Sequence, residues 1–250
     1  KVFINGIWLG MTMTPIDIVN YMKLYRRNDI IDKYICINFD FKLNEINIHS
    51  DGGRPCRPLF YMIDDYLSYQ RPEVIDKFKN NKISWHNLVN GFLENKEKYK
   101  IVKVPNFDDA DIDEWHLNLY INSSVVEYID ALEGESMKLG HSQKDDLNHY
   151  KKNKITHEEI HPSLIFGVMG NMIIFPEHNP CPRNHFSCGQ GKQAVSIYHS
   201  NYRNRVDKSA LYLNYGQIPL TKSRYWNYIG KGEHAYGENA IVAIMCYTGF

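Results

Sequence analysis

The sequence has 250 residues, 43% of them hydrophobic, and a formal net charge of zero. This length can bury one or two hydrophobic cores, and the zero net charge excludes a chain that binds nucleic acid through overall positive charge. The 5 cysteines are an odd number at irregular spacing, which favours free thiols in a reducing compartment. No stretch reaches the ~18 apolar residues of a membrane-spanning helix, so we expect an intracellular protein without a membrane partner.

The first 65 residues are predicted to form hairpins around one helix. Apolar runs flank Asn-Gly at positions 5–6, and this dipeptide favours the positive φ angles of a tight hairpin turn. Thr14 and the proline after it predict a helix start, with the Thr14 hydroxyl as its cap and Asp17 at the capping-box position. The arginine pair at 26–27 suits the end of that helix. Alternating apolar residues over 35–48 predict a second hairpin.

The middle of the chain is predicted to mix strands and helices. Residues 59–63 follow a glycine turn and favour a strand, and residues 72–93 favour one or two helices with Ser84 as a cap. Residues 118–130 are interpreted as strand and turn. Residues 137–154 are polar with little periodicity, which predicts an exposed linker and a domain boundary.

The last hundred residues carry two clear patterns. A helix is predicted over 184–198 with Asn184 as its cap, and the apolar run 240–247 predicts a strand covered on both faces. Together these patterns predict an α+β fold of mixed helices and antiparallel hairpins. Because the chain begins at Lys1 and stops soon after the apolar run, we expect a piece of a longer protein.

Charge is unevenly distributed along the chain. Nine acidic residues and no Lys or Arg lie between Pro105 and Glu135, whereas eight basic residues and one acid lie between His178 and Lys231. A local excess of positive charge attracts phosphates, and the alternative is a solvated face. The eight basic residues are Arg183, Lys192, Arg203, Arg205, Lys208, Lys222, Arg224 and Lys231.

Two groups of residues could bind zinc. The sequence HEEIH at 157–161 satisfies the zinc-protease pattern, which requires a helix, but Pro162 follows at once and disfavours one. The alternative is a turn whose histidines bond backbone or carboxylate groups. A second group, His178, Cys181, His185 and Cys188, has suitable ligand types at a spacing of no common zinc finger. We therefore assign no metal ligands in this chain.

Arg183 marks a candidate phosphate site. It precedes the predicted helix cap, where backbone N–H groups favour anions, and its planar guanidinium fits phosphate. Lys192 and Gln193 follow further along the same helix, and Gly191 leaves room for close approach. A surface arginine paired with a carboxylate is the alternative.

These residues resemble a known family. The segments IFPEHN at 174–179, PRN at 182–184 and GKQA at 191–194 closely resemble one continuous block of the second-largest subunit of eukaryote-type multisubunit RNA polymerases. The similarity extends across nearly the whole chain in one order and is weakest over 66–119. The supporting segments are VFINGIW at 2–8, DGGR at 51–54, RPL at 57–59, VEYIDA at 126–131, EIHPSLIFGV at 159–168, RVD at 205–207, PLT at 219–221 and NAIVAI at 239–244.

The resemblance implies roles for three residues. Arg183 matches an arginine near the triphosphate of the incoming nucleotide, and Gln193 and, more loosely, Lys192 match residues that face RNA in the RNA–DNA hybrid. Catalytic Mg²⁺ is implied to be held mainly by aspartates of the largest subunit. Glu158 stands where the family commonly has a cysteine, which implies that HEEIH is not a catalytic motif.

The resemblance also implies organisation and partners. Residues 1–65 and 66–136 would form external modules, 137–154 a linker, and 155–250 the start of the hybrid-binding region. Partners would be the largest and other polymerase subunits, DNA template, nascent RNA and nucleoside triphosphates. The location would be the nucleus, or the cytoplasm, virus factory and virion for a chain of a large DNA virus. A non-enzymatic RNA- or protein-binding scaffold is the alternative, and a zinc hydrolase ranks last.

Overall fold

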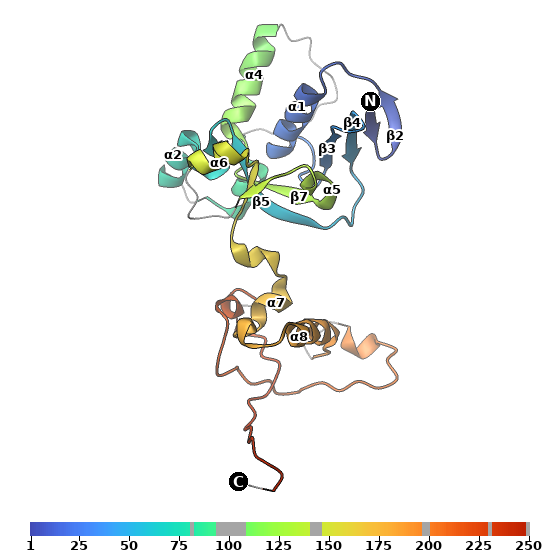
Figure 1. The fold of residues 1–250 in the computed structure, drawn as a ribbon, viewed down its shortest axis with the longest axis vertical. Coiled ribbons are helices and arrows are strands. Elements are labelled where there is room, and N and C mark those ends of the chain that lie inside the picture. Colours follow the sequence, from blue (N-terminus) through green and yellow to red (C-terminus); the bar gives the residue numbers. More distant parts are fainter. Residues whose placement is uncertain (81–82, 94–108, 141–146, 197–200, 230–231, 249–250) are drawn as a thin grey trace. The chain divides into compact units, whose positions relative to one another are not determined.

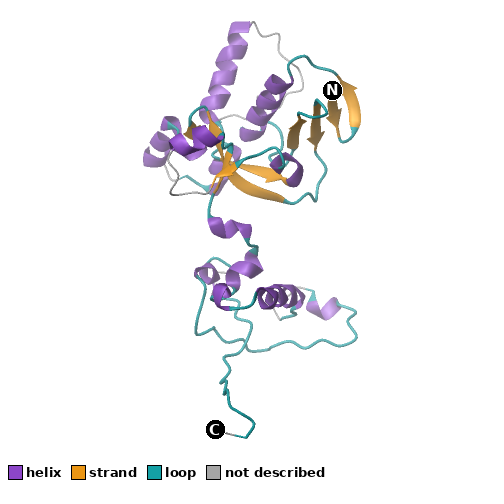
Figure 2. Cartoon of the chain, in the orientation of Figure 1, coloured by secondary structure: helices purple, strands orange, loops and turns teal. Residues whose placement is uncertain are grey.

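The computed structural model describes the chain except for residues 81–82, 94–108, 141–146, 197–200, 230–231 and 249–250. The chain divides into two compact units, Lys1–Pro162 and Ser163–Phe250. Every strand that the structure describes belongs to the first unit, whereas the described part of the second unit consists of short helices and loops (Figure 1, Figure 2).

A four-stranded sheet opens the first unit. Its order is β2-β1-β4-β3, with β1 at Val2–Ile4, β2 at Ile7–Gly10, β3 at Cys36–Asp40 and β4 at Glu45–His49. Asn5 and Gly6 have φ angles of 49° and 81°, so the first predicted hairpin is confirmed. The second is confirmed as well, because β3 and β4 pair antiparallel from Cys36↔His49 to Asp40↔Glu45.

Helix α1, Pro15–Arg27, covers this sheet and closes a small core. Val19 of the helix packs with Ile37, Ile46 and Ile48 of the strands. The helix starts where the sequence predicts, but the Thr14 side chain forms no capping bond, so that detail of the prediction was wrong. The helix ends at the predicted arginine pair, and Arg26 is in addition buried, at 2% exposure.

The second sheet is built around β5, Cys56–Ile63. β5 pairs antiparallel with β6, Tyr66–Leu67, with β7, Val126–Asp130, and with β9, His157–Glu159. β8, Leu139–Gly140, lies parallel to β9. β5 therefore joins segments about a hundred residues apart in sequence, and its Leu59 and Tyr61 are fully buried.

Helices lie between the strands of the second sheet in chain order. They are α2, Pro72–Asn80, α3, Trp85–Asn90, α4, Asp109–Asn122, α5, Ala131–Gly134, and α6, Leu147–Asn153, with the short 3₁₀ turn η1 at Ser68–Gln70. The Ser84 side chain accepts a hydrogen bond from the Asn87 N–H, which confirms it as the α3 cap. The strand expected over 118–130 is partly wrong, because α4 continues to Asn122 before β7 begins.

The predicted linker, 137–154, is partly ordered structure. β8 and α6 lie within it, and Tyr150 of α6 is buried at 2% exposure against Gly140. Residues 141–146 are outside the described part. The compact units divide after Pro162, because β9 pairs with β5 and so keeps 157–159 in the first unit. The functional modules expected from the sequence remain a prediction.

In its described residues, the second unit contains helices and several 3₁₀ turns. They are η3, Pro162–Ile165, α7, Val168–Met172, η4, Pro176–His178, α8, Cys181–Gln193, η5, Tyr202–Asn204, and η6, Arg224–Asn227. The strand predicted over 240–247 was wrong for this structure. These residues form no strand, and side chains such as Ile241, Ile244 and Tyr247 are almost fully exposed, so none of the described strands pairs with this segment or covers it.

The α+β prediction is confirmed, because helices and mainly antiparallel strands share the chain. Two pairings, β1 with β4 and β8 with β9, are parallel and were not predicted. No helix in the described residues combines the length and hydrophobicity needed to cross a bilayer.

Candidate functional site

Helix α8 carries all three of the residues that the sequence selects as site residues. It begins at Cys181, three residues before the predicted start, and ends at Gln193. Pro180 occupies the N-cap position, and Pro182 lies within the first turn, where its fixed φ suits a helix and its missing N–H costs nothing. Asn184 is therefore not the cap, and residues 197–198 of the predicted helix lie outside the described part.

Arg183 lies in the first turn of α8 and its side chain is exposed. The guanidinium carbon is 5.8 Å from the centre of the Phe186 ring. Within the described residues, no carboxylate lies within salt-bridge distance of Arg183. The alternative of an arginine paired with a carboxylate is thus not what this structure contains, and the guanidinium is open to an anionic ligand.

The backbone N–H groups at the start of α8 are less available to an anion than the sequence suggests. The N–H groups of Arg183 and Asn184 both donate to the Pro180 carbonyl, at 3.0 and 3.4 Å. Pro182 has no N–H to offer. The attraction for phosphate at this end of α8 therefore rests on the Arg183 side chain rather than on a row of free backbone donors.

The side chain of Asn184 connects the start of α8 to the turn before it. Its Nδ2 donates to the Pro176 carbonyl at 2.9 Å, and its Oδ1 accepts from Asn179 Nδ2 at 3.3 Å. Phe175 opens this turn with φ 47° and ψ 55°, in the left-handed region that a bulky residue rarely adopts.

Lys192 and Gln193 lie at the opposite end of α8 and are exposed. With a rise of 1.5 Å per residue, they are roughly 15 Å along the helix from Arg183, and Lys192 faces the other side. The three residues share a helix but cannot contact one phosphate together. Gly191 lies against α7, because an added Cβ would be 2.2 Å from the Met169 Cε, the end of a flexible side chain.

The four candidate zinc ligands of the second unit are not gathered into a site. Among the described residues, the group of three or more potential ligand atoms within 4.8 Å of one another is Cys36, Asp130 and Glu133 in the first unit. Cys181 and His185 are exposed, and His178 lies beside Glu177 at 3.6 Å. These four residues are therefore not arranged as one metal site in this structure.

The HEEIH sequence is not a helix, so the protease pattern fails on geometry. His157, Glu158 and Glu159 form β9, where successive side chains point to opposite faces of the sheet. His157 Nε2 lies 2.7 Å from Glu127 Oε1. The histidine–carboxylate contact expected as the alternative is therefore present for His157, but in a strand rather than a turn.

Glu127 belongs to a buried charge network that the sequence did not reveal. Arg26 contacts Glu133 at 2.7 Å and Glu127 at 3.2 Å, and Arg27 contacts Glu127 at 2.9 Å. Both glutamates are at most 3% exposed. The signal available in sequence was the acidic segment opposite an arginine pair, but the partners are about a hundred residues apart.

Burial and the two arginines act in opposite directions on Glu127. Burial favours the neutral acid, but the positive charges of Arg27 and Arg26 and the hydrogen bond from His157 hold the pKa of Glu127 well below its usual range. Asp130 behaves similarly. Burial opposes its ionisation, yet the Glu133 N–H, Cys36 and Arg54 lower the pKa of Asp130. These carboxylates are ionised and paired with arginines, so we assign them a role in stabilising the fold.

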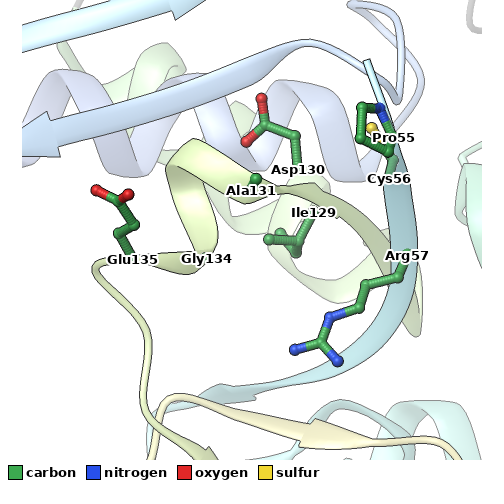
Figure 3. A pocket seen from close by; sticks show the side chains of 8 residues that line it. All are labelled: Pro55, Cys56, Arg57, Ile129, Asp130, Ala131, Gly134 and Glu135. Atoms are coloured by element: carbon green, nitrogen blue, oxygen red, sulfur yellow. The ribbon is translucent and has the colours of Figure 1, made fainter. Parts of the chain in front are cut away.

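A pocket of about 470 Å³ lies beside this network (Figure 3). Arg57 and Glu135 lie at its two sides, and Asp130 and Cys56 also line it. The adjoining Cys36, Asp130 and Glu133 cluster is unsuited to Mg²⁺. Its carboxylates already accept from Arg54 and Arg26, burial raises the pKa of the Cys36 thiol, and Mg²⁺ prefers oxygen ligands. The pocket contains none of the predicted site residues.

The basic segment of the second unit is a solvent-facing surface in the described residues. Arg203, Lys208, Lys222 and Arg224 are exposed, and Lys231 lies outside the described part. Arg205 pairs with Asp207 at 2.6 Å. Both interpretations from the sequence, a phosphate-attracting face and a solvated one, therefore remain compatible with these positions.

The chain is similar to RNA polymerase subunits over its whole length. Residues 2–62 match the family model described as RNA polymerase Rpb2, domain 4, and residues 169–250 match RNA polymerase Rpb2, domain 6. The chain is 34% identical over 251 residues to the DNA-directed RNA polymerase II subunit RPB2 of Encephalitozoon cuniculi and 32% identical over 274 residues to that of Schizosaccharomyces pombe. It is 34% identical over 254 residues to DNA-directed RNA polymerase subunit 2 of Acanthamoeba polyphaga mimivirus.

These alignments cover 100% of this chain but only 20–21% of each relative. The chain thus spans about a fifth of the length of the curated relatives it matches. Helix α8 and its three predicted site residues lie inside the segment that matches domain 6.

Proposed function

This chain belongs to the family of the second-largest subunit of multisubunit DNA-directed RNA polymerases, and we propose that it helps to bind the incoming nucleotide and the RNA–DNA hybrid. The polymerase as a whole would be the nucleotidyltransferase that synthesises RNA on a DNA template. This chain would contribute contacts to that reaction and would be active only within the multisubunit complex.

The observation that carries this proposal is the exposed guanidinium of Arg183. It is open among the described residues, whereas Arg26, Arg27 and Arg54 contact carboxylates. A guanidinium offers a planar set of donors that matches phosphate oxygens. In this proposal Arg183 contacts the triphosphate and stabilises the negative charge that grows on the departing pyrophosphate.

Lys192 and Gln193 would contact a different part of the ligand. Their separation of roughly 15 Å from Arg183 along α8 is too long for a shared phosphate but suits neighbouring parts of a nucleotide and an RNA strand. Lys192 would supply a positive charge to the RNA backbone, and Gln193 would supply a neutral donor and acceptor.

Mg²⁺ would be held mainly by the largest polymerase subunit rather than by this chain. The described residues offer one gathered group of potential ligands, and it contains a thiol and two carboxylates already bonded to arginines. When bound, the metal ions supply charge neutralisation at the reacting phosphates. The partners of this chain would be that subunit, the other polymerase subunits, DNA template, nascent RNA and nucleoside triphosphates.

The place of action follows from this role. RNA synthesis on DNA would locate the chain inside the cell, in the nucleus or, for a viral chain, in the cytoplasm, virus factory and virion. The similarity to both cellular subunits and a mimivirus subunit is compatible with either setting.

Single-nucleotide addition by the assembled polymerase tests the proposal. We expect Arg183→Ala to lower the rate of addition and raise the apparent Kd of the nucleoside triphosphate, together about 10- to 100-fold in kcat/KM, as for loss of a charge-assisted hydrogen bond. Arg224→Ala is a matched control, because Arg224 is also exposed and lies 5.9 Å from an aromatic ring centre, that of Tyr225. Unchanged kinetics in Arg183→Ala would contradict the proposed contact between Arg183 and the nucleoside triphosphate.

A further inference from the structure

The start of α8 has no side-chain cap, as is also the case for α1 and α7. Ser84 caps α3 by accepting from the Asn87 N–H, and Asp130 caps α5 by accepting from the Glu133 N–H. Pro180 occupies the same position in α8 and has no side-chain acceptor. Replacing a capping side chain typically costs about 1 kcal/mol, so a hydrogen bond from within the first turn can strengthen a helix start that has no such cap.

Asn184 supplies that interaction from inside the turn. Its half-buried amide donates to the Pro176 carbonyl at 2.9 Å and accepts from Asn179 Nδ2 at 3.3 Å. The Pro176 carbonyl also accepts the Asn179 N–H at 3.2 Å. The Asn184 side chain therefore bonds to the first residue of the turn Pro176–His178 and to Asn179, which follows the turn, and so joins the turn to the start of α8.

The turn itself needs external support. Phe175 adopts φ 47° and ψ 55°, a conformation that costs a bulky L-residue energy and persists only when neighbours fix it. The Phe175 ring, 60% exposed, gains little from burial and contacts His178 edge-on at 5.5 Å. The hydrogen bonds of Asn184 are thus well placed to hold both the strained turn and the helix start.

We propose that Asn184 is a positioning residue for Arg183. Its amide fixes the first turn of α8 against the Pro176–His178 turn and so sets the direction in which the Arg183 guanidinium projects. This inference rests on the proposed function of Arg183. Asn184 itself contacts no substrate, and its effect on nucleotide addition is transmitted through its neighbour.

A double-mutant cycle in the complete polymerase tests this coupling. Misplacing a catalytic contact by about 1 Å can cost on the order of 100-fold in rate, so we expect Asn184→Ala to lower kcat/KM for nucleotide addition about tenfold. In the Arg183→Ala background, the same Asn184→Ala substitution is expected to change kcat/KM less than about twofold, because the residue it positions is already absent.

A milder variant and a count of active complexes separate positioning from loss of fold. Asn179→Ala removes one of the two partners of Asn184 at an exposed position, and we expect a loss of about threefold that also disappears in the Arg183→Ala background. Rates are normalised to the fraction of complexes that extend RNA. If Asn184→Ala fails to assemble, the Asn179→Ala cycle decides the question.

The outcomes distinguish the two proposals. If Arg183→Ala lowers kcat/KM but Asn184→Ala has no effect, or has the same effect with and without Arg183, Asn184 is not a positioning residue and the role of Arg183 stands. If Arg183→Ala has no effect, the proposed function itself fails and the positioning role fails with it. Coupling between the two substitutions supports both.

Discussion

Arg26 in the first unit and Arg183 in the second are both residues of long helices, but their surroundings differ. Arg26 is 2% exposed and contacts Glu127 and Glu133, whereas Arg183 is exposed and has no carboxylate within salt-bridge distance among the described residues. A buried charge must be matched inside the protein. An exposed one can remain available to a ligand, so the same residue type stabilises the fold in one unit and is offered to a phosphate in the other.

The largest effect on stability is expected from removing the negative charge of Glu127, which Arg26 and Arg27 share. We expect Glu127→Gln to lower the free energy of unfolding of the first unit by about 3–5 kcal/mol, because Arg26 and Arg27 would lose a buried counter-charge. Hydrogen exchange of the β7 amides reports on this unit. Glu135→Gln, at an exposed glutamate nearby, is the control and is expected to change little.

Acid should weaken the same network without a mutation. The pKa values of Glu127 and Asp130 are lowered in the folded chain, so their stabilisation is complete above the unfolded values of about 4 and is lost as pH falls through the lower folded values. We expect the unfolding free energy of the first unit to decline below about pH 4. A Glu127→Gln chain should decline less steeply, and an equal slope would mean that other acids dominate.

Gly91 tests whether the backbone around the network is equally constrained. Its φ is 77°, and an added Cβ would lie 2.8 Å from the carbonyl oxygens of Arg27 and Asn122. We expect Gly91→Ala to destabilise the first unit by about 1–3 kcal/mol from the backbone conformation, with the clash adding to it. Gly52→Ala, with no atom within 4 Å and no positive φ, should be tolerated. Equal melting temperatures of the two variants would contradict this account.

An exposed ion pair is expected to contribute least to the free energy of unfolding. Arg57 contacts Glu159 at 2.5 Å, but its side chain is 44% exposed. Solvent screens such pairs, so we expect Arg57→Ala to cost at most about 1 kcal/mol in urea unfolding. A loss as large as that of Glu127→Gln would show that burial does not decide the strength of these pairs.

The sequence predicted local structure better than distant contacts. The Asn5-Gly6 hairpin and the Ser84 cap were predicted correctly, because each depends on a few neighbouring residues. The pairing of β5 with β7 and the contact of Arg26 with Glu127 depend on segments about 70 and about 100 residues apart, which no local pattern encodes. The apolar run 240–247 resembled a buried strand, but a strand forms only where a partner strand is present.

The candidate site was predicted in part for the same reason. A helix near Arg183 follows from local signals, yet its start was placed at Asn184 because an asparagine is a common cap. Two prolines shift the start to Cys181, and this frees the Asn184 side chain to bond the preceding turn. The separation of Arg183 from Lys192 along α8 follows from helix geometry, whereas the exposure of Arg183 required the structure.

Inhibition by inorganic tripolyphosphate tests most directly whether Arg183 contacts the triphosphate, because this probe has the phosphates without base or sugar. In the assembled polymerase at constant free Mg²⁺, we expect Arg183→Ala to raise the inhibition constant of tripolyphosphate about tenfold or more, and Arg224→Ala to leave it unchanged. Inhibition by a nucleoside that lacks phosphates should be the same in all three enzymes. An unchanged tripolyphosphate inhibition constant in Arg183→Ala would contradict the account.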